Sequence, residues 1–446
     1  MVHHISPGAR AAALALTGIV LAACGGDGAS ETGGGGRFGA LDGPDVILDP
    51  QTQDVYTVGA LEGEEWETFG NVSGLVFDAN GNLFMLDRDA GHIVMISPTG
   101  EFVRTIGRQG QGPGELVSPF SLALLPEDRL VVFDFSKMGF QVFGTDGEFI
   151  ESVTLSPEDG LPGGVILPTP DAPPGPHGGI RLSFKGGGGG EGEPSGRPIE
   201  TFGLDGSRDV AYSAWAPPPP GEGEGDETEL SAGDSRIKLR MDQTVAFEPD
   251  LHLGILSDGR FAVVDSVGYR VKLVRDGVVE STLERPIAPT VVDESIEELE
   301  RERRLAALEE GGPGGGGGRM MVISAGGSGA GGGNISVGQD QINQMMRTQI
   351  EGMGFASEIP VIERMRVDWN DRIWVQRTGA RPGEDGPTDI LTADGGYLGS
   401  IAADGLRIPD AFGPGGLVAY IEQDELEIQR VRVARLANDQ ALEAGR

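Results

Sequence analysis

Few side chains in this sequence have the types and spacings that metal or nucleophilic chemistry requires. Beyond the N-terminal segment the histidines are His92, His177 and His252, which are far apart and form no pair with ligand spacing, so zinc chemistry is poorly supported. The run from Gly326 to Ala330 approaches the G-x-S-x-G pattern of a nucleophilic serine, but it lies in a low-complexity stretch with no strand before it. We therefore expect no catalytic residue and no metal ligand from sequence motifs.

Two glycine-containing runs could be mistaken for ligand loops. The run Gly110 to Gly114 lacks the Lys and Ser/Thr of a phosphate loop, and the Glu115 that follows would repel phosphate, so we expect a turn with positive φ angles. The run from Asp78 to Asn82 begins like a calcium loop, but its glycine is fourth instead of sixth. A hairpin turn explains this second run.

Composition narrows the classes of partner. The chain has 446 residues, a formal net charge of -35 and 38% hydrophobic residues, so it can bury a core. Nucleic acid and anionic lipid surfaces would repel such an acidic protein, whereas a metal cation or a basic partner would not. The single cysteine excludes an intramolecular disulfide and a structural zinc site of the multi-cysteine kind.

That cysteine, Cys24, follows an N-terminal segment with the properties of an export signal. Residues 11–23 form an uncharged apolar run after Arg10, too short to span a bilayer as a permanent helix. The run Leu21 to Gly25 resembles the lipobox of bacterial lipoproteins, which implies a signal peptide over residues 1–23 and acylation of Cys24. Residues 24–44 would form a flexible tether. We therefore expect a lipid-anchored protein of the cell envelope, on the periplasmic face, the outer membrane or the cell surface.

The rest of the chain repeats. Residues 78–106 resemble residues 129–153, and the matched positions keep a constant offset of 47, with Asp87 on Asp134 and Phe102 on Phe149. Each unit consists of short apolar strands separated by Gly and Asp turns, and the pattern returns four more times. Such a unit cannot cover both faces of its sheet alone and must stack on its neighbours. The sequence predicts an all-β, six-bladed β-propeller over residues 45–437, with residues 55–58 as the outer strand of the last blade and residues 438–446 as a tail.

One unit carries a family resemblance. Asp265, Arg270 and the apolar strand that follows are spaced as in the NHL repeat, and Asp134 and Gln141 keep part of that pattern. With the lipobox, the chain is similar to six-bladed β-propeller lipoproteins of bacteria. The resemblance implies architecture and does not imply one activity, because propellers have many functions.

Insertions interrupt the repeat. Residues 168–179, 186–198 and 216–235 are rich in Pro, Gly and Glu and are predicted to be mobile loops. Between blades four and five, residues 287–359 should contain two short helices, Ser295 to Glu310 and Gln339 to Met353, joined by a glycine-rich span. The apolar stripe of the second helix, which includes Met345 and Met346, would either be its buried face or grip an apolar partner.

The candidate binding residues follow the aspartates that end the strands. They are the polar or aromatic departures from the repeat and comprise Arg88, His92, Lys137, Tyr269 and Arg270. In a propeller such positions converge at one mouth of the ring. They have an alternative interpretation, in which they brace the turns of their own blades. Trp374 takes an apolar strand position and should lie in the core.

These observations favour binding over catalysis. We expect a binding or scaffold module for a protein, peptide or glycan, anchored to the membrane through Cys24, with no nucleic acid partner and no cofactor. Some propeller enzymes with this architecture hold a divalent metal on the ring axis, so a metal-dependent hydrolase or lyase is the alternative function. A structural component of an envelope complex is a third.

Overall fold

The computed structural model divides the chain into two compact units, Met1–Gly33 and Gly34–Arg446, and every residue that it describes belongs to the second. It describes residues 44–154, 167–168, 180–183, 196–217, 227–232, 235–240, 244–309, 322–323, 335–336, 339–424, 426 and 428–437. The predicted signal peptide, Cys24, residues 24–43 of the tether, His177 and the tail from 438 lie outside these residues. The predicted loops at 168–179, 186–198 and 216–235 lie mostly outside them.

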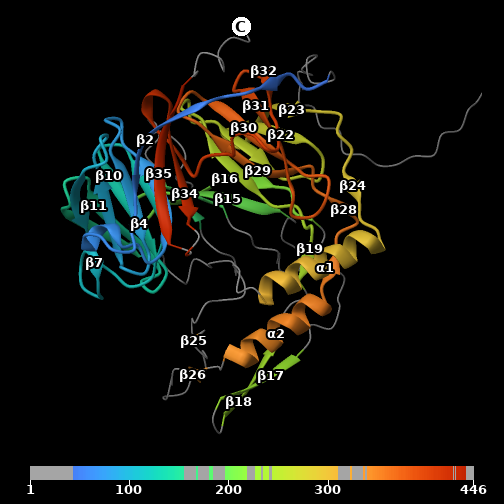
Figure 1. The fold of residues 1–446 in the computed structure, drawn as a ribbon, viewed down its shortest axis with the longest axis horizontal. Helices are drawn as coiled ribbons and strands as arrows, with labels where there is room; N and C mark the ends of the chain where they lie inside the picture. Colours follow the sequence, from blue (N-terminus) through green and yellow to red (C-terminus); the bar gives the residue numbers. More distant parts are fainter. Residues whose placement is uncertain are drawn as a thin grey trace, which may run out of the picture. The chain divides into compact units, whose positions relative to one another are not determined.

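Six sheets of four or five strands dominate the described part of the chain (Figure 1), which confirms the all-β propeller fold. We number them as blades 1 to 6. Blade 1 contains β3 (Val72–Phe77), β4 (Leu83–Asp87), β5 (His92–Ile96) and β6 (Phe102–Ile106). Blade 2 contains β9 (Pro119–Leu125), β10 (Arg129–Asp134), β11 (Gly139–Gly144) and β12 (Phe149–Thr154). Blade 3 contains β13 (Leu167–Pro168), β14 (Ile180–Ser183), β15 (Arg197–Phe202) and β16 (Arg208–Ala214).

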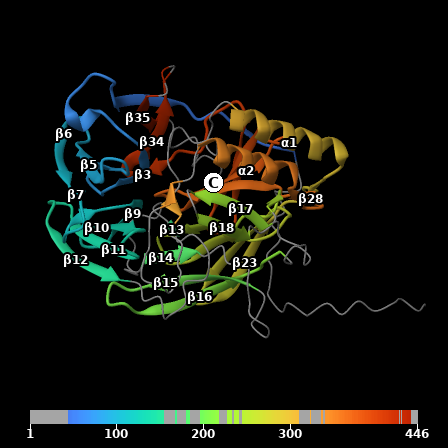
Figure 2. The same cartoon turned by 90° about the horizontal axis from the view of Figure 1, so that it is seen from below.

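The second half of the chain supplies the other three blades. Blade 4 contains β20 (His252–Ile255), β21 (Phe261–Val264), β22 (Arg270–Arg275) and β23 (Val278–Glu284). Blade 5 contains β29 (Ile362–Val367), β30 (Arg372–Thr378), β31 (Asp385–Thr392) and β32 (Tyr397–Ile401), with β1 (Ile47–Leu48) as a fifth strand. Blade 6 contains β33 (Ala411–Phe412), β34 (Leu417–Gln423), β35 (Gln429–Leu436) and β2 (Thr52–Val58). In Figure 2 the first strands β3, β9 and β13 lie toward the middle, and the fourth strands β6, β12 and β16 lie outside.

The N-terminal strand closes the last blade, as the sequence predicted. β2 pairs antiparallel with β35, from Thr52 opposite Leu436 to Val58 opposite Val431. The strand is longer than the predicted residues 55–58. A strand from the start of the chain therefore pairs with the outer side of β35 and becomes the outermost strand of the final sheet.

The core consists of six apolar clusters, and each lies between two successive blades. Alternate residues of one strand enter different clusters: in β4, Leu83 and Met85 pack toward blade 6, whereas Phe84 and Leu86 pack toward blade 2. Because both faces of each sheet are buried, the middle strands are almost continuously apolar. Trp374 is fully buried between blades 5 and 6, as predicted. The cluster between blades 6 and 1 completes the ring.

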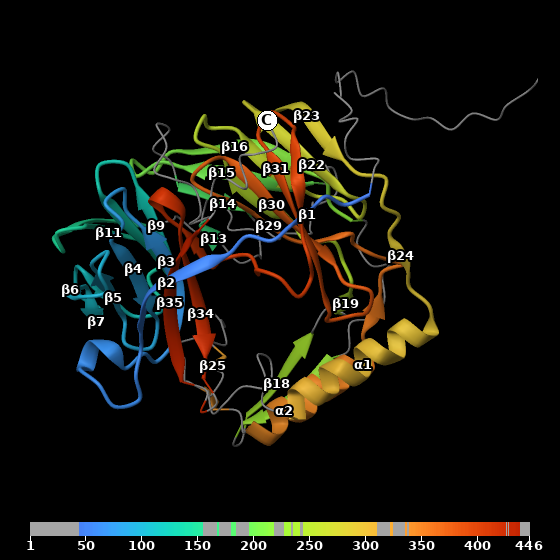
Figure 3. The same ribbon diagram turned by 45° about the horizontal axis from the view of Figure 1, so that its top comes forward.

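The remaining elements are short. They comprise η1 (Glu65–Glu67), β7 (Arg108–Gln109), β8 (Glu115–Leu116), β17 (Glu227–Ala232), β18 (Ser235–Arg240), β19 (Val245–Ala246), β24 (Thr290–Val291), α1 (Glu294–Glu309), β25 (Val322–Ile323), β26 (Ile335–Ser336), α2 (Gln339–Glu351), β27 (Gly354–Phe355), β28 (Glu358–Ile359) and η3 (Pro414–Gly416). Both predicted helices are present between blades 4 and 5, and they lie side by side (Figure 3). Among the described residues, no helix is both long and apolar enough to cross a membrane.

The two glycine-containing runs are turns, as predicted. Gly110 and Gly114 have φ angles of +154° and +72°, which glycine adopts without a steric penalty. At the other run, Asp78 accepts hydrogen bonds from the backbone N–H groups of Asn80 and Asn82, at 2.9 and 2.8 Å. The carboxylate of Asp78 is therefore engaged by its own hairpin turn.

Candidate functional site

The strand order makes the two ends of the ring different. Each blade begins with its innermost strand, so all connections between blades lie at one end, together with the turns between second and third strands. We call this the connection end. The strand β19, the hairpin β17–β18 and the helices α1 and α2 all belong to these connections. In Figure 2 the hairpin β17–β18 and the two helices lie in front of the sheets. The hairpin β17–β18 and the two helices are therefore insertions at the connection end.

Buried aspartates organise the connection end. Asp134, at the end of β10, accepts hydrogen bonds from the N–H groups of Val117 (2.6 Å) and Ser118 (3.2 Å), which precede β9. It also accepts the N–H groups of Ser136 (3.0 Å) and Lys137 (3.3 Å) in the turn that follows. Asp87 bonds the corresponding four groups in blade 1. The repeated aspartate therefore fastens each turn to the entry of the innermost strand.

Two of the predicted site residues bind backbone groups of this end. Arg88 donates from Nε to the carbonyl oxygen of Pro119 at 3.1 Å, and its guanidinium lies 4.9 Å from the centre of the Phe120 ring. Lys137 donates from Nζ to the carbonyl oxygens of Gly112 (2.9 Å) and Glu115 (2.6 Å). Arg88 thus links blade 1 to the start of β9, and Lys137 links blade 2 to the connection that leads into it. These contacts fit the bracing interpretation.

His92 lies opposite Asp87 in the β4–β5 pair and is half-buried. Burial lowers the pKa of His92, although the carboxylates of Asp87 and Glu65 act in the opposite direction. The imidazole is therefore disposed to be neutral near pH 7.

The other two predicted residues belong to blade 4. Tyr269 is 1% exposed and lies in the cluster between blades 4 and 5, where burial raises the pKa of its hydroxyl well above its usual value. Arg270 is exposed and its Nε lies 3.2 Å from Glu284 Oε1. The five predicted residues thus share the connection end, but they contact different neighbours in blades 1, 2 and 4. Their role in binding stays a prediction.

A feature that the sequence analysis missed is the distribution of exposed apolar side chains. Of the fourteen large ones that are exposed among the described residues, six lie on connections or turns of the connection end. These six are Leu61, Phe135, Trp215, Val291, Leu299 and Leu426. Phe102 and Val278 begin the outer strands β6 and β23, beside turns of the opposite end, and the others lie on the N-terminal segment or on outer strands. The six lie on different connections and turns around the ring, and binding residues are commonly found on loops held by a rigid scaffold.

Bulges alter the innermost strands at the same end. The pairing of first and second strands skips one residue in three blades, and the skipped residues are Ser73, Phe120 and Glu363. Each lies near the start of its strand. A bulge turns a side chain away from the regular alternation, and bulges are frequent near functional sites. Sequence periodicity could not reveal them, because a bulge depends on the register with the partner strand.

Helix α1 is anchored beside one of these bulges. Its Arg303 holds the buried Glu300 through two hydrogen bonds of 2.7 and 2.8 Å, and its side chain packs next to Gly383 in a turn of blade 5. Partial burial raises the pKa of Glu363, and the Asp385 carboxylate adds to this effect, while Arg364 and Arg303 oppose it. The helical insertion therefore meets the ring at a polar contact on the connection end.

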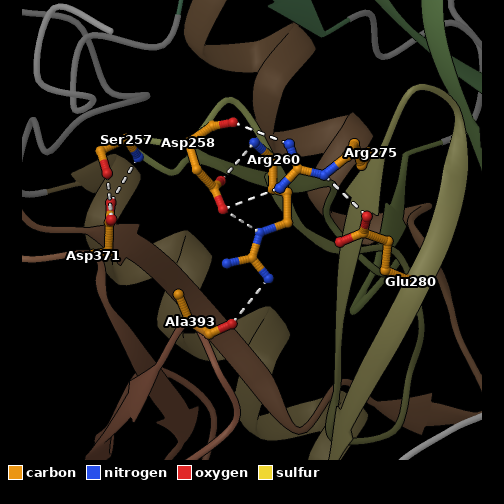
Figure 4. A network of polar contacts seen from close by, with 7 residues as sticks. All are labelled: Ser257, Asp258, Arg260, Arg275, Glu280, Asp371 and Ala393. Atoms are coloured by element: carbon orange, nitrogen blue, oxygen red, sulfur yellow. Dashed lines mark hydrogen bonds and ion pairs between the residues drawn. The ribbon is translucent and has the colours of Figure 1, made fainter.

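The opposite end is held by contacts between neighbouring turns (Figure 4). Asp371 in blade 5 accepts the backbone N–H of Ser257 in blade 4 at 2.7 Å. Arg260 donates to Asp258 at 2.7 Å and to the carbonyl oxygen of Ala393 at 3.0 Å. These polar groups are satisfied by one another. Throughout the described residues, no three His, Cys, Asp or Glu side chains are grouped so that they could hold a metal ion.

Comparisons with known proteins agree with this architecture. Residues 54–158 match a family model described as "6-bladed beta-propeller". The fold and this match define a β-propeller protein. No curated protein matches the chain in sequence.

Solved structures of low identity cover most of the chain. A Bacteroides fragilis protein described as exported is 10% identical, with a TM-score of 0.46 over 89% of this chain and 98% of its own. A member of the DUF4221 family from Bacteroides vulgatus is 10% identical, with a TM-score of 0.45 over 87% and 98%. Virginiamycin B lyase from Staphylococcus aureus is 11% identical, with a TM-score of 0.37 over 87% and 99%. None of these likenesses assigns an activity to this chain.

Proposed function

We propose that this protein is a membrane-anchored binding or scaffold module of the cell envelope, and that the connection end is its binding surface for a protein, peptide or glycan. The observation that carries the proposal is that six exposed apolar side chains, among them Phe135, Trp215 and Leu299, lie on connections and turns of this end. The helical insertion adds further surface at the same end. Binding surfaces of this kind are built on loops held by a rigid scaffold.

The envelope location rests on the sequence around Cys24 and its resemblance to a lipobox. A tether of about twenty residues would leave the folded body free to approach a partner near the membrane. The acidic balance of the chain favours a partner surface that is neutral or basic, because like charges repel.

Site-specific photo-cross-linking in cells tests this proposal. A photoreactive residue at position 135 should give covalent adducts with a partner, because Phe135 is 60% exposed on the connection end. The matched control is position 278, since Val278 is 64% exposed beside a turn of the opposite end. Equal adducts from both positions, or adducts from position 278 alone, would overturn the proposed surface.

A metal measurement separates binding from the alternative enzyme. For a binding module we expect no stoichiometric divalent ion in protein purified without added ions, and no change of the melting temperature with chelator. A tightly held ion whose removal lowers the melting temperature would instead favour the hydrolase or lyase.

A further inference from the structure

The outer edge of blade 5 is covered by a segment from the far N-terminal side of the body. β1 pairs parallel with β32, with Ile47 opposite Ser400 and Leu48 opposite Ile401. The backbone N–H of Ser400 donates to the carbonyl oxygen of Val46 at 2.7 Å, and the N–H of Val46 donates to the Tyr397 hydroxyl at 3.3 Å. An extended peptide that adds to a sheet edge in this way is a recurrent mode of peptide recognition.

The edge strand is shaped for this close approach. Gly399 has a φ of +152°, a conformation that disfavours other residues. A Cβ atom at this position would lie 2.6 Å from both the carbonyl oxygen of Val46 and Cγ of Leu48. Any side chain at Gly399 would therefore displace the segment.

Two arginines beside the edge hold one carboxylate of the segment. Arg285 Nη2 and Arg377 Nη2 lie 2.6 and 2.5 Å from the two oxygens of Asp45. The Arg285 side chain is 4% exposed, and its Nη1 also lies 2.7 Å from the fully buried Asp389. Partial burial tends to raise the pKa of Asp45, but the hydrogen bonds from Arg377 and Arg285 outweigh it and hold the pKa below its usual value. Arg285, Arg377, Asp45 and Asp389 form a network of alternating charges. The network favours a carboxylate at the position of Asp45.

The other end of the segment is recognised through an apolar contact. Leu48 packs against the cluster between blades 5 and 6. The residues between, Val46 and Ile47, are 57% and 67% exposed and are held mainly through their backbones. The edge of blade 5 thus contacts the side chains of an aspartate and of a leucine three positions later.

We propose that the outer edge of blade 5 is a receptor site for an extended peptide with Asp three residues before Leu, and that residues 45–48 occupy it as an internal ligand. A partner protein that presents such a peptide displaces the segment. This site lies on the outside of blade 5, so the proposal does not depend on the connection end.

The covalent link explains why the internal ligand prevails in the isolated chain. A segment joined through a short linker acts at an effective concentration in the millimolar range. A free peptide of equal affinity therefore competes only at about millimolar concentration, and a weakened internal segment should admit it at lower concentration.

The test measures binding of a fluorescent peptide with the sequence of residues 41–50 to the full chain by anisotropy. We expect the Asp45→Asn chain to bind this peptide at least about tenfold more tightly than the wild type, because the substitution removes a charge-assisted bond of the competitor. A peptide with Asn in place of its own Asp should bind the variant chain at least about tenfold more weakly. Arg377→Gln, added to the Asp45→Asn chain, should weaken binding of the original peptide by a similar factor. Arg364→Gln, on the innermost strand of the same blade, is the matched control and should leave the peptide affinity unchanged.

Three results would overturn the proposal. Equal peptide affinity for the wild type and the Asp45→Asn chain would show that the segment does not occupy a peptide site. Faster hydrogen exchange of the Ser400 amide in the Asp45→Asn chain would show that the segment has left the edge. If this variant still bound no peptide, the freed edge would not be a peptide site. Native mass spectrometry that finds strand-exchanged dimers of the variant, without peptide, would assign the site to a second copy of the chain.

Discussion

At the residue scale, several buried aspartates in this protein organise backbone. Asp134 is fully buried and bonds four N–H groups, and Asp368 bonds the N–H groups of Asn370 and Arg372 in a hairpin turn of blade 5. A charged acceptor satisfies several donors that water cannot reach. The aspartates that end the strands are thus explained by structure, without a ligand.

We expect Asp134→Ala to lower the free energy of unfolding by about 3 kcal/mol, because the substitution leaves four N–H groups without their acceptor. Asp134→Asn keeps one carbonyl oxygen and should lose about half as much. Urea unfolding measures both values. Glu151→Ala, at an exposed position on β12 of the same blade, is the control and should stay within about 0.5 kcal/mol of the wild type. An equal effect of the control would contradict this role of Asp134.

At the element scale, helix α1 depends on one buried acid. Glu300 is 1% exposed and binds Arg303 and Arg304, the latter with Nε at 2.6 Å. Burial acts to raise the pKa of Glu300, but the hydrogen bonds from the two arginines hold it below the usual 4.5. Helix α2 joins α1 through Arg347 and Glu309, whose charged atoms are 2.8 Å apart. An exposed ion pair therefore joins the two helices of the insertion, and two pairs of Glu300 lie within α1.

Glu300→Gln should make the backbone amides of α1 exchange about tenfold faster at pH 7, equivalent to about 1.4 kcal/mol of local stability. The difference from the wild type should shrink as the pH falls from 4.5. The pKa of Glu300 is lower in the folded helix than in the open helix, so ionised Glu300 stabilises the helix above pH 4.5. Protonation of Glu300 at lower pH removes this stabilisation, and the wild type then approaches the variant. Hydrogen exchange detected by mass spectrometry measures both effects. An unchanged difference at lower pH would exclude the ion pairs as its cause.

Much of this element structure was predictable from local sequence. Residues on a strand such as β4 pack against two neighbouring blades, so both faces must be apolar and the apolar runs recur in the sequence. Helix α1 lies within one residue of its predicted bounds. The bulge at Phe120 and the exposure of Phe135 depend on register and on turn geometry, which periodicity does not encode. The contact between Asp45 and Arg285 joins residues 240 positions apart, so no local sequence pattern predicts it.

At the scale of the whole molecule, the sequence predicts a body held at a membrane by one modified residue. Cys24→Ser should move the protein from the membrane fraction to the soluble fraction, because the acylated thiol would be absent. Immunoblotting of fractionated cells measures the shift, and the unchanged unfolding curve of the released protein is the control. Persistent membrane association of the variant would show that another anchor exists.

The closing strand β2 also sets an order in time. Asp54 of β2 bonds Arg432 of β35 across 378 residues, so the strand that is synthesised early finds its partner only after β35 has been made. Closing a loop of this length costs about 5 kcal/mol of chain entropy, which slows the step relative to the local hairpins. We expect blades 1 to 5 to form before the ring shuts. Until then the edge of β35 in blade 6 stays open to other chains, so the interval between synthesis and closure is when this protein is most exposed to aggregation.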